Sequence, residues 1–219
     1  MQIPCNAKNF HNFFNVSRET IKKLILYEEL LKKQNDKYNL ISKSSVANIW
    51  IRHFADSAKI FYILKEMQAF KKLKSVSLCD VGSGAGLPGA LIEMLKLEEG
   101  LNCKTTLIES NAKKCNFLND INKKLCLNAQ IINARSEELN QKFDIIVARA
   151  VAPLTKLLEQ TIKISKNQTF FVFPKGKKWN LEVNLLKKKW NYQMNIVKNN
   201  KLIDKSGGVT LILTNCKKK

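Results

Sequence analysis

Histidine and closely paired cysteines are scarce in this 219-residue chain, and their scarcity argues against a metal centre. The only histidines are His11 and His53, and the six cysteines form no Cys-x-x-Cys pair. Because zinc sites are built from closely spaced cysteines and histidines, none is predicted. Cys79 falls in a predicted strand, and Cys115 and Cys126 fall in a predicted helix. We expect reduced thiols that pack as small apolar groups, and therefore a cytoplasmic protein.

Long apolar segments are also missing. Lysine interrupts the apolar runs before any of them reaches the roughly 20 residues that cross a bilayer. The N-terminus has no basic segment followed by an apolar one. We expect neither a signal peptide nor a membrane span.

Acidic residues are few, at 18 against 38 basic ones, which gives a net charge of +20. Such an excess predicts a polyanionic partner, most commonly nucleic acid and less commonly a membrane surface. The excess is nearly all lysine, because arginine occurs only at Arg18, Arg52, Arg135 and Arg149. Asparagine is abundant too, a pairing typical of AT-rich codon usage. Part of the charge therefore has a compositional explanation that competes with a binding surface.

The chain does contain a glycine-rich segment, Asp80-Val-Gly-Ser-Gly-Ala-Gly-Leu-Pro-Gly89, between a strand-like run and a helical one. Glycines let a backbone turn sharply and approach a ligand. The dinucleotide fingerprint places its third glycine three residues after the second, but Leu87 stands there and the glycine comes early, at Gly86. The spacing around Gly82 and Gly84 therefore favours S-adenosylmethionine over NAD.

Glu109 supports this choice. It ends the next predicted strand, Thr105 to Ile108, where a carboxylate can accept hydrogen bonds from the ribose hydroxyls of an adenosine cofactor. The competing interpretation is a plain tight turn, followed by an acid that stabilises a helix N-terminus.

Two amphipathic helices are predicted before this loop. The first covers residues 17–37 and has Ser17 as its N-cap. The second begins near Ser45, and its apolar face is formed by Val46, Ile49, Trp50, Phe54, Ala58 and Phe61. We expect residues 1–70 to form a helical cap and residues 71–219 a core, joined in one compact domain, with Lys71 to Lys74 at the boundary.

Downstream of the loop, strands and helices alternate. Strands are predicted at 130–132, 143–147, 169–173, 192–197 and 209–213, and helices at about 111–126, 154–165 and 178–190. This order is typical of a doubly wound parallel sheet, an α/β fold, with the last two strands as a hairpin at its edge.

The chain resembles the 16S ribosomal RNA guanine-N7 methyltransferase G family, also called glucose-inhibited division protein B. The resemblance covers most of the chain, and its motifs occur in the family's order. They are Tyr38-Asn-Leu-Ile-Ser42, Arg52-His-Phe-Ala-Asp-Ser57, Asp80 to Gly89, Ala148-Arg-Ala-Val-Ala152 and Phe173-Pro-Lys-Gly176. Many methyltransferases share the glycine loop, but the combination with the second and fourth motifs is specific.

This resemblance implies a Rossmann-like class I methyltransferase with N-terminal helices packed on the sheet. The implied reaction moves the methyl group of S-adenosylmethionine to N7 of one guanosine near the decoding centre of 16S rRNA. By motif position, the implied cofactor contacts are Gly82, Leu87, Ser136, Glu137 and Arg149, beside the loop residues Gly84 and Gly86 and the acid Glu109. The substrate is 16S rRNA or the small ribosomal subunit, and we expect a monomer.

N7 of guanine carries its own lone pair, so methyl transfer to it needs positioning and no general base. Arg149 follows a predicted strand at the carboxyl edge of the sheet, where ligands bind, and is expected to contact the cofactor carboxylate or the guanine. The alternative for Arg149 is a salt bridge to Asp144 or Glu137. Lys175 follows the fifth strand and is expected to contact phosphate, or else to be solvated. His53 is expected to make structural hydrogen bonds.

Other activities fit the sequence less well. Exocyclic amine methylation usually employs an Asn/Asp-Pro-Pro-aromatic segment after strand four, where this chain has Arg149 to Pro153. C5 methylation of pyrimidines needs a thiolate, but the only Pro-Cys pair, Pro4-Cys5, lies in the N-terminal tail. The alternatives are a methyltransferase for another RNA, and a non-catalytic ribosome-assembly factor that retains the cofactor loop.

Overall fold

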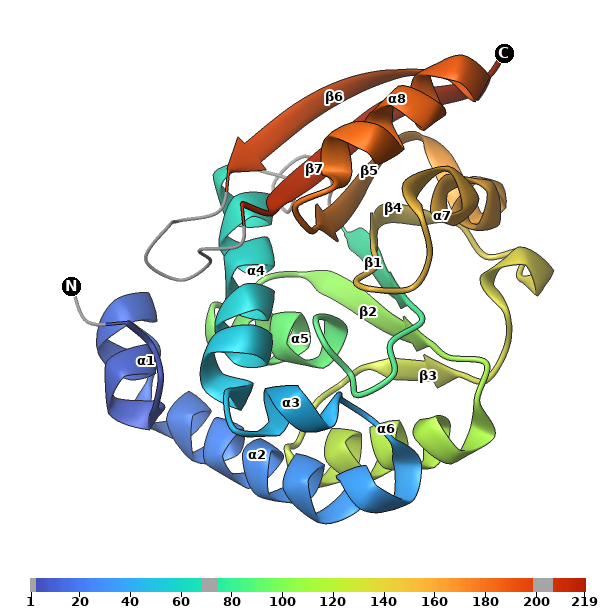
Figure 1. Cartoon of the computed structure of the whole chain (residues 1–219). Coiled ribbons are helices and arrows are strands. Elements are labelled where there is room, and N and C mark those ends of the chain that lie inside the picture. The colour runs from blue at the N-terminus through green and yellow to red at the C-terminus, as the bar shows by residue number, and fades with distance from the viewer. Residues whose placement is uncertain (1–2, 68–74, 199–206) are drawn as a thin grey trace.

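The computed structural model describes residues 3–67, 75–198 and 207–219. These residues form one seven-stranded sheet in the order β3-β2-β1-β4-β5-β7-β6 (Figure 1). The strands are β1 (Val76–Val81), β2 (Cys103–Ile108), β3 (Gln130–Ile132), β4 (Phe143–Val147), β5 (Ser165–Lys175), β6 (Trp190–Lys198) and β7 (Val209–Lys218). The predicted boundary at Lys71 to Lys74 lies outside the described residues.

The sheet has the predicted doubly wound topology. Strands β1 to β5 are parallel, and the order of the sheet reverses between β1 and β4. Strand β7 pairs antiparallel with both β5 and β6, so the predicted edge hairpin is confirmed, with β6 outermost. In such sheets, ligands bind beyond the carboxyl ends of the strands where the order reverses. The loops after β1 and β4 are therefore the expected walls of a site.

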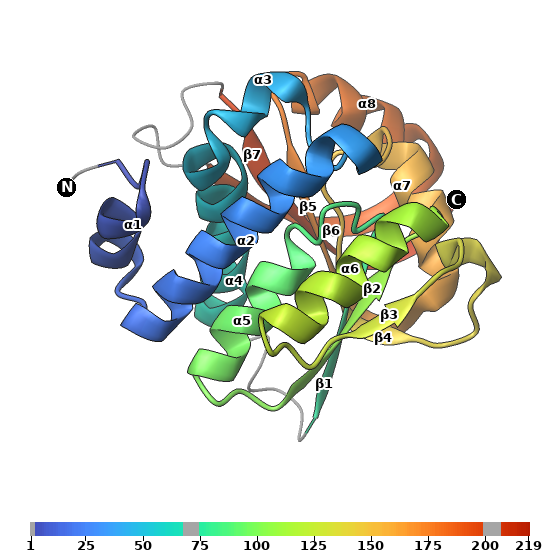
Figure 2. The same ribbon diagram turned by 90° about the horizontal axis from the view of Figure 1, so that it is seen from below.

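Helices cover both faces of the sheet (Figure 2). Successive residues of β1 show why: Leu78 packs into one apolar cluster and Cys79 into the other, since strand side chains alternate between faces. The first cluster lies under α1 (Ala7–Phe14), α2 (Arg18–Tyr38), α4 (Asp56–Glu66), α5 (Gly89–Glu98) and α6 (Ala112–Lys124). The second lies under α7 (Leu154–Thr161) and α8 (Trp179–Lys189).

The first predicted helix is confirmed as α2, and Ser17 caps it by accepting a hydrogen bond from the Thr20 amide at 3.1 Å. The prediction of the second helix as a single element is wrong. It consists of α3 (Lys43–Val46), a π-helical segment η1 (Trp50–Ala55) and then α4. Most of its predicted apolar face is nevertheless buried, from Ile49 to Phe61. Arg52 and His53 lie in this π-helical segment and face the carboxyl edge of the sheet. Such π-helical distortions are frequent at functional sites.

Some elements were missed or differ from their predicted extents, among them β7, which continues five residues beyond its predicted end to Lys218. Helix α1 was not predicted. The predicted helix over 154–165 ends at Thr161 and continues as a 3₁₀ turn, η3 (Ile162–Ile164). Strand β5 begins four residues before its predicted start, at Ser165, and its exposed residues Lys166 to Gln168 show no apolar alternation. Thr169 Oγ1 donates to the Phe143 carbonyl at 2.6 Å and tethers this polar extension to β4.

Candidate active site

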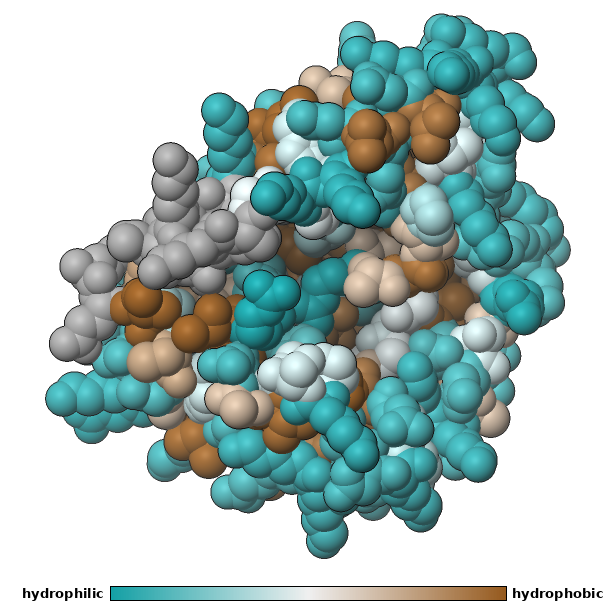
Figure 3. Space-filling model, viewed as in Figure 1, coloured by the Kyte–Doolittle hydropathy of each residue, from teal (hydrophilic) through white to brown (hydrophobic). Residues whose placement is uncertain are grey.

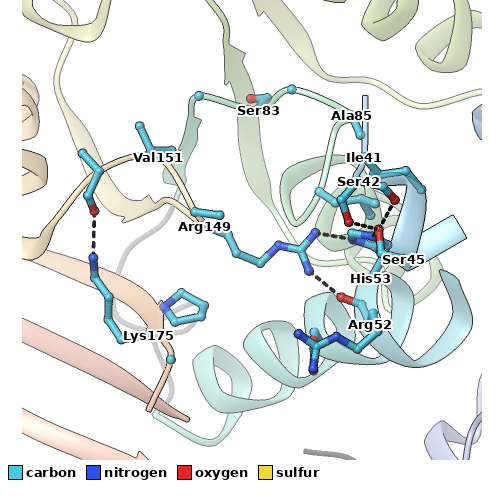
Figure 4. Close-up of a pocket in the computed structure, with 18 of the residues that line it drawn as sticks. Ile41, Ser42, Ser45, Arg52, His53, Ser83, Ala85, Arg149, Val151 and Lys175 are labelled. Carbon is cyan, nitrogen blue, oxygen red and sulfur yellow. Dashed lines mark hydrogen bonds between the residues drawn. The ribbon is translucent and has the colours of Figure 1, made fainter. Parts of the chain in front are cut away.

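An open pocket of about 980 Å³ lies at the carboxyl edge of the sheet. Its walls are the glycine loop after β1, the loop after β4, the turn after β5, helix α8, and the N-terminal segment from Leu40 to Lys59. The pocket therefore stands where the doubly wound topology places ligands, and the N-terminal helices close one side of it. Figure 4 shows the side chains that meet in it.

The glycines of the loop have different roles. All three predicted ones have positive φ, at 68° for Gly82, 53° for Gly84 and 83° for Gly86. A Cβ on Gly86 would lie 2.7 Å from Tyr27 Oη and 2.9 Å from Ile121 Cδ1, so Gly86 lets α2 and α6 pack on the loop. A Cβ on Gly84 would meet nothing closer than the Gly82 carbonyl oxygen at 3.8 Å. Gly84 thus presents bare backbone to the pocket.

Glu109 holds the shape of this loop. Its Oε2 accepts a hydrogen bond from the Gly84 amide at 2.9 Å, and its Oε1 accepts one from the Asn111 amide at 2.8 Å. The residue is 8% exposed and directly follows β2, as predicted. Because each carboxylate oxygen has a second lone pair, both can accept a further hydrogen bond.

Two buried groups under the loop were not predicted as site residues. Asp80 Oδ2 accepts a hydrogen bond from the Gly89 amide at 2.9 Å, where α5 begins. Burial raises the pKa of Asp80 to about 7, partly offset by that hydrogen bond. From α2, Tyr27 Oη donates to the Ala85 carbonyl at 2.5 Å. The N-terminal helices thus help to set the conformation of the loop.

Arg149 reaches from the loop after β4 to the π-helical segment (Figure 4). Its Nη1 donates to the Arg52 carbonyl at 3.0 Å and its Nη2 donates to His53 Nδ1 at 2.8 Å. His53 Nε2 lies 2.9 Å from Ser45 Oγ. A guanidinium only donates, so Nδ1 is the acceptor and the proton of the neutral ring is on Nε2. Asp144, the predicted alternative partner of Arg149, instead pairs with Lys166 at 2.7 Å.

His53 is held neutral. Its pKa is lowered from 6.5 to about 3, first by burial and then by the cations of Arg149 and Arg52. The structure shows the structural hydrogen bonds that the sequence predicted for this residue. With both ring nitrogens engaged, His53 positions Arg149.

Lys175 lines the pocket but its ammonium group is already bonded. It donates to the Ala152 carbonyl at 2.8 Å and pairs with Glu182 of α8 at 2.9 Å, and its side chain is 9% exposed. Glu182 also accepts from the Leu154 amide at 2.6 Å. Lys175 therefore ties the loop after β4 to α8, and a positioning role fits it better than phosphate contact. The neighbouring Lys177 is exposed, as a phosphate ligand would be.

The structure brings together half of the predicted cofactor residues. Gly82, Gly84, Leu87 and Arg149 line the pocket. Gly86 packs against α2 and α6, and Glu109 holds the loop through its hydrogen bond to the Gly84 amide. Ser136 and Glu137 form η2 (Ser136–Glu138), which follows β3, and Ser136 Oγ donates to the Gln160 carbonyl at 3.1 Å.

The described residues contain neither a metal cluster nor a membrane-spanning helix. In the three described ranges, no three histidine, cysteine or acidic side chains gather as a metal site would require. No helix among the same residues has the length and apolarity of a membrane span.

Comparisons with known proteins agree with the fold. The family described as rRNA small subunit methyltransferase G matches residues 20–207. The chain is 34% identical to ribosomal RNA small subunit methyltransferase G of Ruegeria sp. over 80% of its length and 82% of the relative's. It is 37% identical to the protein of that name from Cereibacter sphaeroides, over 77% of its length and 78% of the relative's.

Among solved structures, a putative class I S-adenosylmethionine-dependent methyltransferase from Listeria monocytogenes superposes with a TM-score of 0.61. The match covers 92% of this chain and 70% of that one at 13% identity, so it shows the class I fold alone. The sequence relatives show more than the fold, because their identity extends over most of both chains. The chain belongs to the rRNA small subunit methyltransferase G family.

Proposed function

We propose that this protein transfers the methyl group of S-adenosylmethionine to N7 of a guanosine in 16S rRNA, near the decoding centre. Family membership supports the enzyme class, the methyl donor and small-subunit rRNA as substrate. The choice of N7 rests on the pocket. We further propose that the protein acts as a monomer in the cytoplasm.

The residues present fit this methyl donor, which carries its reactive methyl on a sulfonium. The bare backbone at Gly84 leaves room for the nucleoside beside the loop. Glu109 has free lone pairs for the ribose hydroxyls, and its bonds to the loop fix its orientation. The Arg149 guanidinium carries more N–H donors than the two in use, so it can also hold the methionine carboxylate. Ser136 and Glu137 are proposed contacts for the adenine end.

The observation that carries the choice of N7 is that each base lining the pocket in the described residues is bonded to a cationic side chain. In the part of the chain that the structure describes, His53 uses both ring nitrogens, Asp56 pairs with Lys59 at 2.9 Å, and Glu182 pairs with Lys175. An exocyclic amine must lose a proton during methylation, whereas N7 attacks through a lone pair that it already has. A pocket whose bases are each held by a cation suits N7, where in-line positioning lowers the barrier.

The rim of the pocket is basic, as an RNA substrate requires. Lys114, Lys178 and Arg52 line it, and hydrophilic side chains lie along parts of the border of the hollow at the centre of this face (Figure 3). Cationic side chains around the mouth can neutralise the phosphates beside a base that has been turned into the pocket. A looped guanosine is the accessible target, because the deep, narrow major groove of an A-form RNA helix hides N7.

Methyl transfer to purified small ribosomal subunits tests the proposal. Subunits from cells that lack this gene should take up label from [methyl-³H]S-adenosylmethionine, and subunits from cells that have the gene should not. Calorimetric titration should show binding of S-adenosylhomocysteine and none of NAD. Cofactor binding without transfer would favour the non-catalytic assembly factor, and label in another RNA would move the substrate.

A further inference from the structure

Helix α8 carries two apolar faces, and the fold uses one of them. Val183 and Leu186 are buried in the core between α8 and the sheet. Leu181 and Leu185 lie one helical turn apart on the opposite side and are 62% and 59% exposed. Hydrophobic side chains stand out over α8, above the hollow in Figure 3. We call Leu181 and Leu185 the leucine pair.

The leucine pair belongs to the pocket. Both leucines line it, together with Val151 of the loop after β4, which is 39% exposed. The other large apolar side chains that are exposed in the described ranges are Ile3, Ile25, Leu26 and Leu97, at 40% or less, and none of them lines this pocket. The two most exposed apolar side chains of the described protein thus line the same pocket as Arg149 and the glycine loop. Exposed apolar groups gathered at a site mark a binding surface.

We propose that the leucine pair is a platform on which a nucleobase of the RNA segment carrying the target guanosine stacks. The inference rests on the proposed function and deepens it, because it assigns the occupant of this surface to the RNA substrate. A base has apolar faces, and enzymes that act on bases hold them against aromatic or apolar side chains. Val151 would complete the apolar surface from the opposite loop.

The charged side chains around the leucine pair favour RNA over other occupants of this surface. Lys178 precedes α8 and lines the pocket, and Lys187 and Lys188 are exposed at the other end of the helix. The one acid of α8, Glu182, is paired with Lys175. A strip of two leucines with cations at both ends matches a base flanked by phosphates.

The small area of this apolar surface disfavours a protein occupant. A stable protein interface buries about 800 Å² on each partner, far more than two leucines and a valine offer. A second copy of this chain and a ribosomal protein are therefore the outcomes against which the proposal is tested.

The test compares L181A/L185A with the matched control L97A, which shortens a leucine that is 40% exposed at the end of α5, away from the pocket. Alanine keeps the helix, and both sites are exposed, so all variants should melt close to the parent protein. For L181A/L185A we expect KM for small subunits to rise about tenfold or more. The affinity for S-adenosylhomocysteine should not change. L97A should match the parent, and L181M/L185M should restore KM.

An unchanged KM in L181A/L185A, or an equal loss in L97A, would overturn the proposal while leaving the proposed function intact. Absence of transfer by the parent protein would instead refute the proposed function. The occupant is identified by photo-cross-linking from Leu185→benzoylphenylalanine in complex with small subunits. Cross-links to 16S rRNA near the methylated guanosine support the platform. Cross-links confined to a ribosomal protein or to a second copy of the chain, or no cross-link at all, contradict it.

Discussion

Replacement of His53 by asparagine is expected to make the protein less sensitive to acid. His53 is neutral in the fold because burial and the cations of Arg149 and Arg52 lower its pKa from 6.5 to about 3. In the unfolded chain it regains an ordinary pKa and binds a proton at mildly acidic pH. The unfolded state therefore binds more protons than the folded state, so stability is lost as pH falls below about 6.5.

The size of the effect follows from that difference. Between about pH 7 and about pH 5, the unfolded state gains a proton that folded His53 does not accept, which costs about 2 kcal/mol of unfolding free energy. Asparagine does not titrate, and its Oδ1 can still accept from Arg149. Urea unfolding of the parent protein and H53N at both pH values measures the effect as a double difference, to which the other titrating groups contribute equally. The same pH dependence in both proteins would refute a buried, neutral His53.

Three further predictions concern the pocket. R149A should reduce methyl transfer roughly 10- to 100-fold and lower the melting temperature little, because water that enters the open pocket can replace its hydrogen bonds to Arg52 and His53. Unfolding with full specific activity would mean a structural role. G86A should lose roughly 2 to 4 kcal/mol in urea unfolding through strain and its clash with Tyr27, whereas G84A, which has open space, should lose about 1. Because Asp80 has a pKa of about 7, its ionisation lowers the stability of the parent protein as pH rises. Between about pH 5 and 8, the unfolding free energy of D80N in urea should therefore rise by roughly 2 to 3 kcal/mol relative to that of the parent.

The elements that the sequence predicted well are those with a strong local pattern. Apolar runs bounded by polar residues placed the strands, and Ser17 and the glycine spacing marked the start of α2 and the cofactor loop. The missed elements lack such a pattern. The extension of β5 before Thr169 is polar and exposed, and it is held by a side-chain bond to Phe143 that no periodicity reveals. The π turn at His53 keeps an apolar spacing close to that of an α-helix.

The site was predictable where a residue follows a strand closely. Glu109 directly follows β2 and Arg149 lies two residues after β4, and both were predicted at the sheet edge because the carboxyl ends of parallel strands meet there. Partners from distant segments were not predictable: Tyr27 reaches the loop from α2, and Lys175 turns to Glu182 instead of the solvent. The exposed leucines of α8 looked like ordinary helix residues until the fold showed which face was already buried.

Mapping the modified nucleotide tests the central claim most directly. Small subunits from cells lacking the gene are methylated by the purified protein, and their 16S rRNA is treated with borohydride and aniline, which cleave the chain at N7-methylguanosine. We expect one new cleavage, at a guanosine near the decoding centre, that depends on S-adenosylmethionine and forms roughly 10- to 100-fold more slowly with R149A. Methyl groups on an exocyclic amine, with no cleavage at any guanosine, would contradict it.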